Sequence, residues 1–341
     1  MTRFGVLVIA VLAVWPAAQT ARSSSGGLTN AAAIARAYDT ILDADFDGAR
    51  AQLLTVCPPG PAEACRMLSA VASWWEISLD PANTALDARF SRVVEQAIAE
   101  TEAWAKREPR RPEAWFYVGA AYGARVQWRV LREQRLAAAR DGKRIKEALE
   151  QALALDPALH DAKFGVGMYR YYADVGPAAL KWLRWVLLLP GGNRVEGLRQ
   201  MTEARDSGQV VRGEADYQLH LAYLWYEKRS REALTIVRGL QQRYPHNPLF
   251  HDIEAEIQDK YFHDRKASLA TSTRLLALAE SGRVYHADLA AVTARLNIAT
   301  QLLALGDRPR ADAILTALLA QRPSRPADAI TRAQTLLERA R

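Results

Sequence analysis

The spacing of aromatic, small and proline residues constrains the fold of this chain more than any other feature. Trp115 is followed four residues later by Gly119, and Tyr122 stands three residues further on. A later stretch places Ala152 five residues before Pro157. Small residues let two helices approach closely, and a proline ends the second helix. The spacing therefore predicts antiparallel helix pairs, which must stack because one pair cannot bury its apolar face alone.

Comparable spacings recur at residues 213–245 and 292–323. Over roughly residues 112–323 the chain resembles the tetratricopeptide repeat (TPR) superfamily, with divergent repeats. The resemblance implies an all-α, TPR-like helical-repeat solenoid, with the array at 111–325 and a capping helix at 326–341.

Two segments of the array are longer than the standard repeat and are interpreted as insertions. The first, 123–144, is expected to extend a helix and then turn at Asp141–Gly142. The second, 175–193, contains Trp182 and Trp185. These insertions depart from the regular repeat, so a regular superhelix is not expected through the middle of the chain.

The composition supports helix over strand throughout. Hydrophobic residues make up 50% of the 341 residues, which is ample for a large core. Ala and Leu are abundant, whereas alternating stretches of β-branched residues are absent. Apolar residues at three- and four-residue spacing also predict an N-terminal helical region at 30–110.

The N-terminus has the character of a secretory signal peptide, which we place at residues 1–21. A short positive region with Arg3 precedes an apolar run from Phe4 to Val14, and small residues follow. An uncleaved anchor is the alternative, but the run is too short to span a bilayer comfortably. Residues 22–29 are expected to form a flexible lead-in. The chain is therefore predicted to be exported and to act in the periplasm or outside the cell.

The two cysteines, Cys57 and Cys65, bracket a loop rich in proline. Because an exported chain meets an oxidising compartment, the pair is predicted to form one disulfide. The alternative is a pair of buried thiols that are near each other only in sequence.

The charge is mixed along the chain, with 45 basic and 38 acidic residues. Such a balance does not indicate a nucleic-acid partner. The densest basic stretch, 125–146, places Arg125, Arg129 and Arg132 on one helix face beside Trp128. It is either a face that binds an anionic partner or an exposed face balanced by nearby acids.

Recognised catalytic, nucleotide-binding and metal-binding motifs are absent from the sequence, so no catalytic residue, cofactor or metal is predicted. His251 and Glu254 share a helix face, which makes a metal site conceivable. We interpret this stretch instead as a polar helix entrance.

The TPR resemblance implies that certain first-helix positions point into a concave face that captures a peptide or helix. Those positions are Phe116, Ala120, Phe164, Met168, Tyr171, Tyr217, Leu221 and Leu224. Trp182 and Trp185 are added as partner-binding candidates because Trp beside Lys and Arg suits a membrane interface or a partner groove. The alternative is an inserted helix packed against the solenoid.

The sequence therefore predicts a non-enzymatic protein-interaction scaffold in the periplasm or cell envelope, whose partner is a protein or peptide. The alternative is an envelope-associated adaptor that binds a membrane surface or wall polymer through 125–146 and 175–190.

Overall fold

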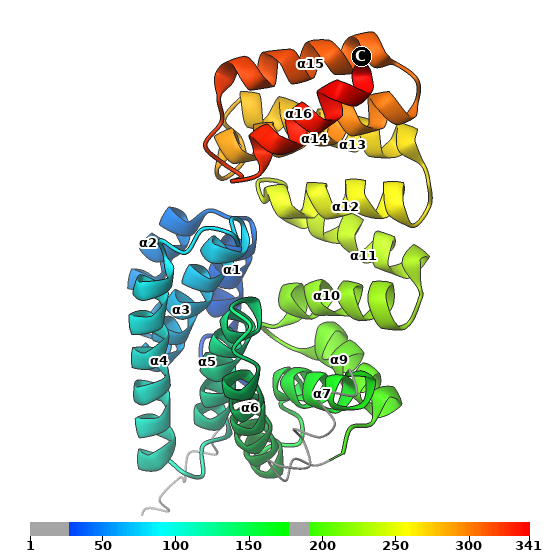
Figure 1. Cartoon of the computed structure of the whole chain (residues 1–341). Helices are drawn as coiled ribbons and strands as arrows, with labels where there is room; N and C mark the ends of the chain where they lie inside the picture. The colour runs from blue at the N-terminus through cyan, green and yellow to red at the C-terminus, as the bar shows by residue number, and fades with distance from the viewer. Residues whose placement is uncertain (1–26, 177–190) are drawn as a thin grey trace, which may run out of the picture.

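A computed structural model describes residues 27–176 and 191–341, and all regular elements in these two ranges are helices (Figure 1). Four helices precede the array: α1 (Ala31–Leu42), α2 (Phe46–Val56), α3 (Ala62–Ser78) and α4 (Asp87–Arg107). Among the described residues, no helix combines the length and apolar character that crossing a membrane requires.

The array consists of helices that pack against their neighbours in the chain. The first two pairs are α5 (Pro112–Leu131) with α6 (Arg135–Leu155), and α7 (His160–Val175) with α9 (Arg194–Ser207). Next come α10 (Arg212–Leu221), continued by the π-helix η1 (Ala222–Tyr226), and α11 (Ser230–Arg243). The last pairs are α12 (Pro248–Lys260) with α13 (Arg265–Glu280), and α14 (Ala287–Ala304) with α15 (Arg308–Gln321), followed by α16 (Ala329–Ala340). The predicted all-α solenoid of stacked helix pairs is confirmed.

Local sequence signals set the starts of these helices. Pro112 and Pro248 stand in the first turns of α5 and α12, where a missing N–H costs nothing. Asp264 and Asp307 cap α13 and α15 by accepting from backbone N–H groups in the first turn. Local residues therefore mark helix starts both between pairs, as at Pro112 and Pro248, and within pairs, as at Asp264 and Asp307.

The turn expected at Asp141–Gly142 is wrong. Helix α5 ends at Leu131 and α6 begins at Arg135, so Asp141 lies inside α6. There its carboxylate accepts from Arg125 at 2.7 and 3.0 Å, and it lies 2.7 Å from the Arg129 guanidinium. These ion pairs fasten α6 to α5 at the position where the sequence suggested a break.

Helices α7 and α9 cross at two glycines. A Cβ atom on Gly197 would lie 2.7 Å from the Gly167 carbonyl oxygen and 2.6 Å from the Tyr171 nitrogen. A Cβ atom on Gly167 would in turn lie 2.7 Å from the Gly197 carbonyl oxygen. The two backbones are in direct contact, which only glycine permits at both positions.

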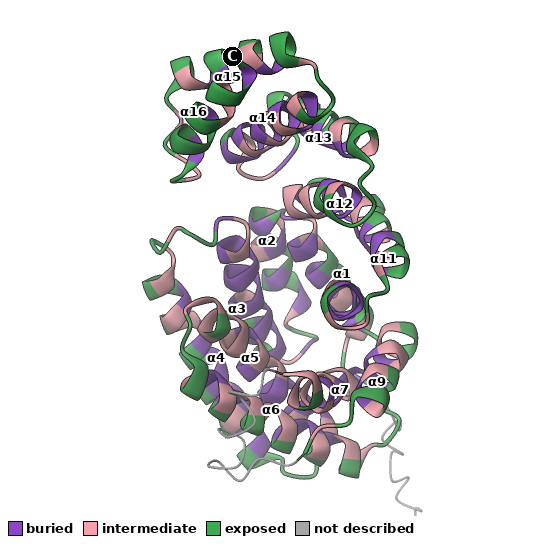
Figure 2. Cartoon of the chain, turned by 45° about the vertical axis from the view of Figure 1, so that its right-hand side comes forward, coloured by how far each residue is buried: buried purple, intermediate pink, exposed green. Residues whose placement is uncertain are grey.

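The N-terminal helices fill the inside of the curved array, and Figure 2 shows α1 within the arc formed by α7, α9, α11 and α12. Tyr244 donates to Asp39 at 2.6 Å, and the Asn247 amide donates to the Leu42 carbonyl at 2.7 Å. Helical-repeat arrays often use their concave surface for binding, but here helices of the same chain lie within it.

A buried carboxylate joins the N-terminal helices to the array. Glu214 of α10 accepts from Tyr38 of α1 at 3.0 Å, from Trp75 of α3 at 3.3 Å and from Gln218 at 3.1 Å. Burial raises the pKa of Glu214, and the three donors oppose that rise. The ring of Tyr217 packs edge to face against Trp75, with centroids 4.9 Å apart.

The predicted disulfide is confirmed. Cys57 at the end of α2 and Cys65 in the first turn of α3 are bonded, with their Cα atoms 6.2 Å apart. That separation lies within the range a disulfide can bridge without backbone strain. The bond closes the loop between α2 and α3.

Residues 27–29 are the described part of the predicted lead-in, and Leu28 and Thr29 are held in place. Leu28 is buried, and its N–H donates to Gln209 at 2.8 Å. Thr29 donates to Glu113 from its backbone and its hydroxyl, at 2.7 and 2.8 Å. The start of α1 is thereby tied to α5 and to the segment before α10.

Candidate partner-binding groove

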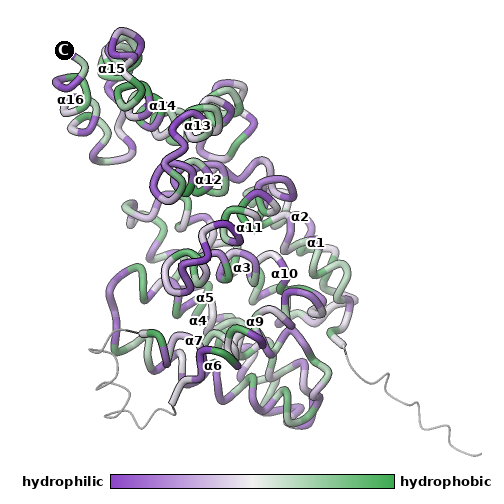
Figure 3. The backbone as a smooth tube through the Cα atoms, turned by 90° about the vertical axis from the view of Figure 1, so that its right-hand side faces the viewer, coloured by the Kyte–Doolittle hydropathy of each residue, from purple (hydrophilic) through white to green (hydrophobic). Residues whose placement is uncertain are grey.

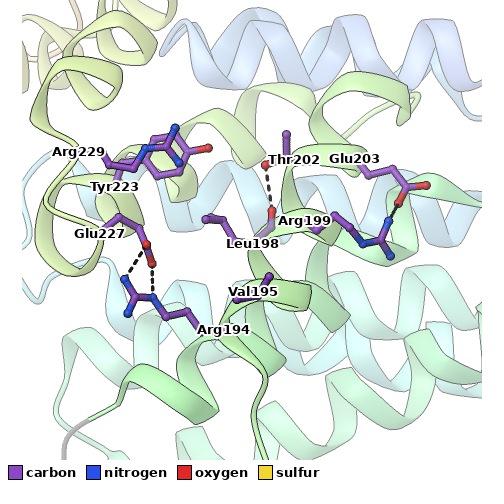
Figure 4. A pocket seen from close by; sticks show the side chains of 9 residues that line it. All are labelled: Arg194, Val195, Leu198, Arg199, Thr202, Glu203, Tyr223, Glu227 and Arg229. Atoms are coloured by element: carbon purple, nitrogen blue, oxygen red, sulfur yellow. Dashed lines mark hydrogen bonds and ion pairs between the residues drawn. The ribbon is translucent and has the colours of Figure 1, made fainter.

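An open groove of about 460 Å³ lies between α9 and the end of α10 with η1 (Figure 4). We call it the α9–η1 groove. Its lining residues are Arg194, Val195, Leu198, Arg199, Thr202, Glu203, Tyr223, Glu227 and Arg229. It sits where the second pair of the array meets the third.

The floor of the α9–η1 groove is apolar. Val195 and Leu198 lie one helical turn apart on α9, and Tyr223 faces them from η1. Val195 is 80% exposed, which is unusual for a large aliphatic side chain on a packed helix. An apolar surface that the chain leaves open to solvent is suited to cover by a partner.

One wall of the groove is a fixed ion pair. Arg194 donates to both oxygens of Glu227, each at 2.7 Å, and Tyr171 also donates to Glu227 at 2.7 Å. The hydrogen bonds from Arg194 and Tyr171, with Arg194 contributing most, lower the pKa of the Glu227 carboxyl. This wall therefore stays charged at neutral pH.

The remaining cations of the rim are exposed and paired with surface acids. Arg199 lies 3.0 Å from Glu203. Arg229 stacks over the Tyr223 ring, 4.3 Å from its centroid, and donates to Glu232 at 3.0 Å. Because solvent-exposed ion pairs contribute little stability, these side chains can turn toward a charged partner at small cost.

A π-helix shapes the floor. In η1 the Glu227 N–H donates to the Ala222 carbonyl at 3.0 Å, one residue further back than in an α-helix. This wider turn places Tyr223 against the groove, while Trp225 points outward and is 53% exposed. Single turns of π-helix occur frequently at functional sites.

The partner-binding candidates from the sequence lie mainly inside the array. Phe116, Tyr171 and Leu224 are buried in packed cores. The partly buried candidates are Ala120, Phe164, Met168, Tyr217 and Leu221. Trp182 and Trp185 lie outside the described residues. Partner binding through these positions stays a prediction, although Tyr171 does reach the groove through its bond to Glu227.

The basic face at residues 125–132 is engaged within the chain. Arg125 pairs with Asp141 and with Glu95 at 2.6 Å, and Arg132 donates to both oxygens of Asp87 at 2.7 and 2.8 Å. Their side chains are only 11% and 16% exposed. These arginines therefore hold helices together. Their pairing favours a basic stretch balanced by nearby acids over a face that binds an anionic partner.

The polar stretch after Pro245 is likewise internally bonded. One ring nitrogen of His251 lies 3.0 Å from the Gln241 amide and the other lies 3.0 Å from the Pro245 carbonyl. Glu254 accepts from Arg238 at 2.9 Å and from Gln241 at 2.7 Å. In residues 27–176 and 191–341, no three His, Cys, Asp or Glu side chains are grouped as metal ligands.

Comparison with known proteins assigns this chain to no family. No protein-family model matches the chain, and no curated protein matches it. Among solved structures, the chain is similar to one described as the crystal structure of the APC/C hetero-tetramer Cut9-Hcn1, with 12% sequence identity and a TM-score of 0.36. The match covers 81% of this chain and 52% of the other, so this chain spans about half the length of that one. The stacked helix pairs themselves define the class: an all-α helical-repeat protein.

Proposed function

We propose that this protein is a non-enzymatic interaction scaffold that binds a polypeptide in the α9–η1 groove. The observation that carries the proposal is an apolar floor of Val195, Leu198 and Tyr223, left open to solvent between charged walls. Apolar centres with charged rims are the usual anatomy of protein–protein interfaces.

The groove suits a polypeptide in two respects. Its open form admits a chain segment laid along α9, with apolar side chains on the floor. Arg199 and Arg229 on the rim are 60% and 44% exposed. They can leave their present ion pairs with surface acids at small cost and pair with carboxylates of the partner instead. Both features follow from a helical-repeat fold, whose stacked pairs create extended binding surfaces.

The proposed location is the periplasm or another exported compartment of the cell envelope. The N-terminal segment supports export by its sequence character, and a disulfide between Cys57 and Cys65 fits an oxidising compartment.

The alternative function, an adaptor for membrane or wall polymer through 125–146 and 175–190, has weaker support at those positions. The arginines at 125, 129 and 132 are paired with Asp87, Glu95 and Asp141. The two tryptophans of the second segment lie outside the described residues. We therefore favour a polypeptide partner.

Site-specific photo-cross-linking tests the proposal. A photoreactive amino acid at Val195 should yield a defined cross-linked polypeptide in envelope extract. The same amino acid at Leu54, which is 82% exposed on α2, provides the matched control. Leu198→Arg should abolish the product. Identical products from the Val195 and Leu54 probes, or a product that survives Leu198→Arg, would contradict binding in the groove.

A further inference from the structure

The exposed apolar side chains of the array gather where the first helix of a pair turns into the second. These places are residues 225–231, 259–266 and 305–310, which we call the turn edge. The α7–α9 turn lies mostly outside the described residues and is not part of it. The large apolar side chains exposed there are Trp225, Tyr261, Phe262 and Leu305 in the turn edge. The α5–α6 turn exposes Val130 and Leu136 as well, but it lies apart from the other turns in Figure 1, so it is left out.

The turn edge is also strongly basic. Its three segments contain eight Lys and Arg residues against four Asp and Glu, and all eight cations are exposed. Five of them make no ion pair with another described residue: Lys228, Arg231, Arg265, Lys266 and Arg308. An exposed aromatic or aliphatic side chain thus stands next to free positive charge at successive turns.

The opposite edge of the array, where one pair connects to the next, can be compared with the turn edge in charge and exposed apolar side chains. Its segments 155–161, 205–212, 243–248 and 280–288 contain four Lys and Arg residues against five Asp and Glu. Among the described residues of these segments, Leu155, which is 36% exposed, is the one large apolar side chain on the surface. The apolar and basic character therefore belongs to one edge and is not a property of turns in general.

The segments of the turn edge follow one another in space. In Figure 1 the turns after η1, α12 and α14 lie one above another along the right-hand side. Figure 3 turns this edge toward the viewer, with hydrophilic and hydrophobic segments adjacent along it. A row of separate contacts on one side of the array can meet a flat surface together.

We propose that the turn edge docks the protein on an anionic phospholipid surface. Trp and Tyr favour the depth of lipid headgroups, and Lys and Arg stems can lie along acyl chains with their charges at the phosphates. Charge complementarity selects anionic over neutral lipid. A polypeptide would have to run the length of the array to reach every cluster, whereas a lipid surface meets them all at once.

Vesicle co-sedimentation of the full chain tests this proposal. We expect binding to vesicles of phosphatidylcholine mixed with phosphatidylglycerol, weakened by added salt, and little binding to phosphatidylcholine alone. Each cation at an anionic surface is worth about fivefold in affinity, so Arg265→Gln with Lys266→Gln should weaken binding about thirtyfold. Tyr261→Ser with Phe262→Ser should also weaken it. None of these residues lines the α9–η1 groove.

Matched controls separate the turn edge from the rest of the chain. Arg212→Gln removes an exposed cation of the opposite edge, and Leu54→Ser removes an exposed apolar side chain of α2. Both should bind vesicles as the unaltered chain does. All variants share the same N-terminal segment, so any contribution from it cancels. Equal binding by the turn-edge variants and the controls would overturn the proposal, and so would equal binding to neutral and anionic vesicles.

Discussion

Substituting Gly197 by alanine should separate α7 from α9. The new methyl group would lie 2.6 Å from the Tyr171 nitrogen and 2.7 Å from the Gly167 carbonyl oxygen. Both are backbone atoms, which cannot rotate away as the end of a side chain could. The two helices must therefore move apart, and Val195 and Leu198, which flank Gly197 on α9, must move with them.

The expected loss of stability follows from two opposing terms. Alanine in place of glycine within a helix contributes about 1 kcal/mol of stability. Overpacking costs about 1–3 kcal/mol, and backbone contacts on two sides place this case at the upper end. The net change is a destabilisation of about 1–2 kcal/mol.

Urea denaturation followed by circular dichroism measures this change. Gly239→Ala in α11 is the matched control, because a methyl group there would meet no atom within 4 Å. That variant should gain about 0.5–1 kcal/mol. The two variants should therefore differ by about 2 kcal/mol. Equal transition midpoints would refute the close crossing of α7 and α9.

Three further predictions concern buried groups. Burial lowers the pKa of the His220 imidazole to about 4. The free energy of unfolding should therefore fall as the pH decreases from about 6.5, the ordinary pKa of histidine, toward 4, because the unfolded chain binds the proton first. His220→Leu should flatten that loss in urea titrations at several pH values. Asp141→Asn should cost about 3 kcal/mol in thermal or urea denaturation, because it leaves Arg125 and Arg129 short of a buried partner, and a neutral effect would contradict that role. Reducing the Cys57–Cys65 disulfide should cost about 2–3 kcal/mol for so short a loop, and an unchanged midpoint after reduction would count against it.

The sequence predicted the helix pairs because their signals are local. Small residues at crossings, prolines at ends and capping acids act within a few positions of where they stand in the chain. The same locality explains the wrong turn at Asp141–Gly142. Asp and Gly together resemble a turn, but Asp141 is held in α6 by two arginines of α5.

The candidate groove could not be predicted, because it depends on how separate helices come together. Val195 has the hydrophobicity of a core residue, and only the position of α9 beside η1 leaves it exposed. The packing of the N-terminal helices against the inside of the array could not be predicted either. Glu214 lies 139 residues from Trp75 in the chain, and no pattern in either stretch indicates that they meet. The turn edge was not predicted either, because the exposure of Trp225, Tyr261 and Phe262 depends on how the helices around each turn pack.

Hydrogen–deuterium exchange on the chain, alone and with the polypeptide captured by cross-linking, tests the central claim most directly. The account predicts slower exchange in residues 194–203 of α9 and 222–229 in and after η1, with α13 to α16 unchanged. Protection confined to other helices, with α9 and η1 exchanging as in the free chain, would contradict the claim that the α9–η1 groove is the partner-binding site.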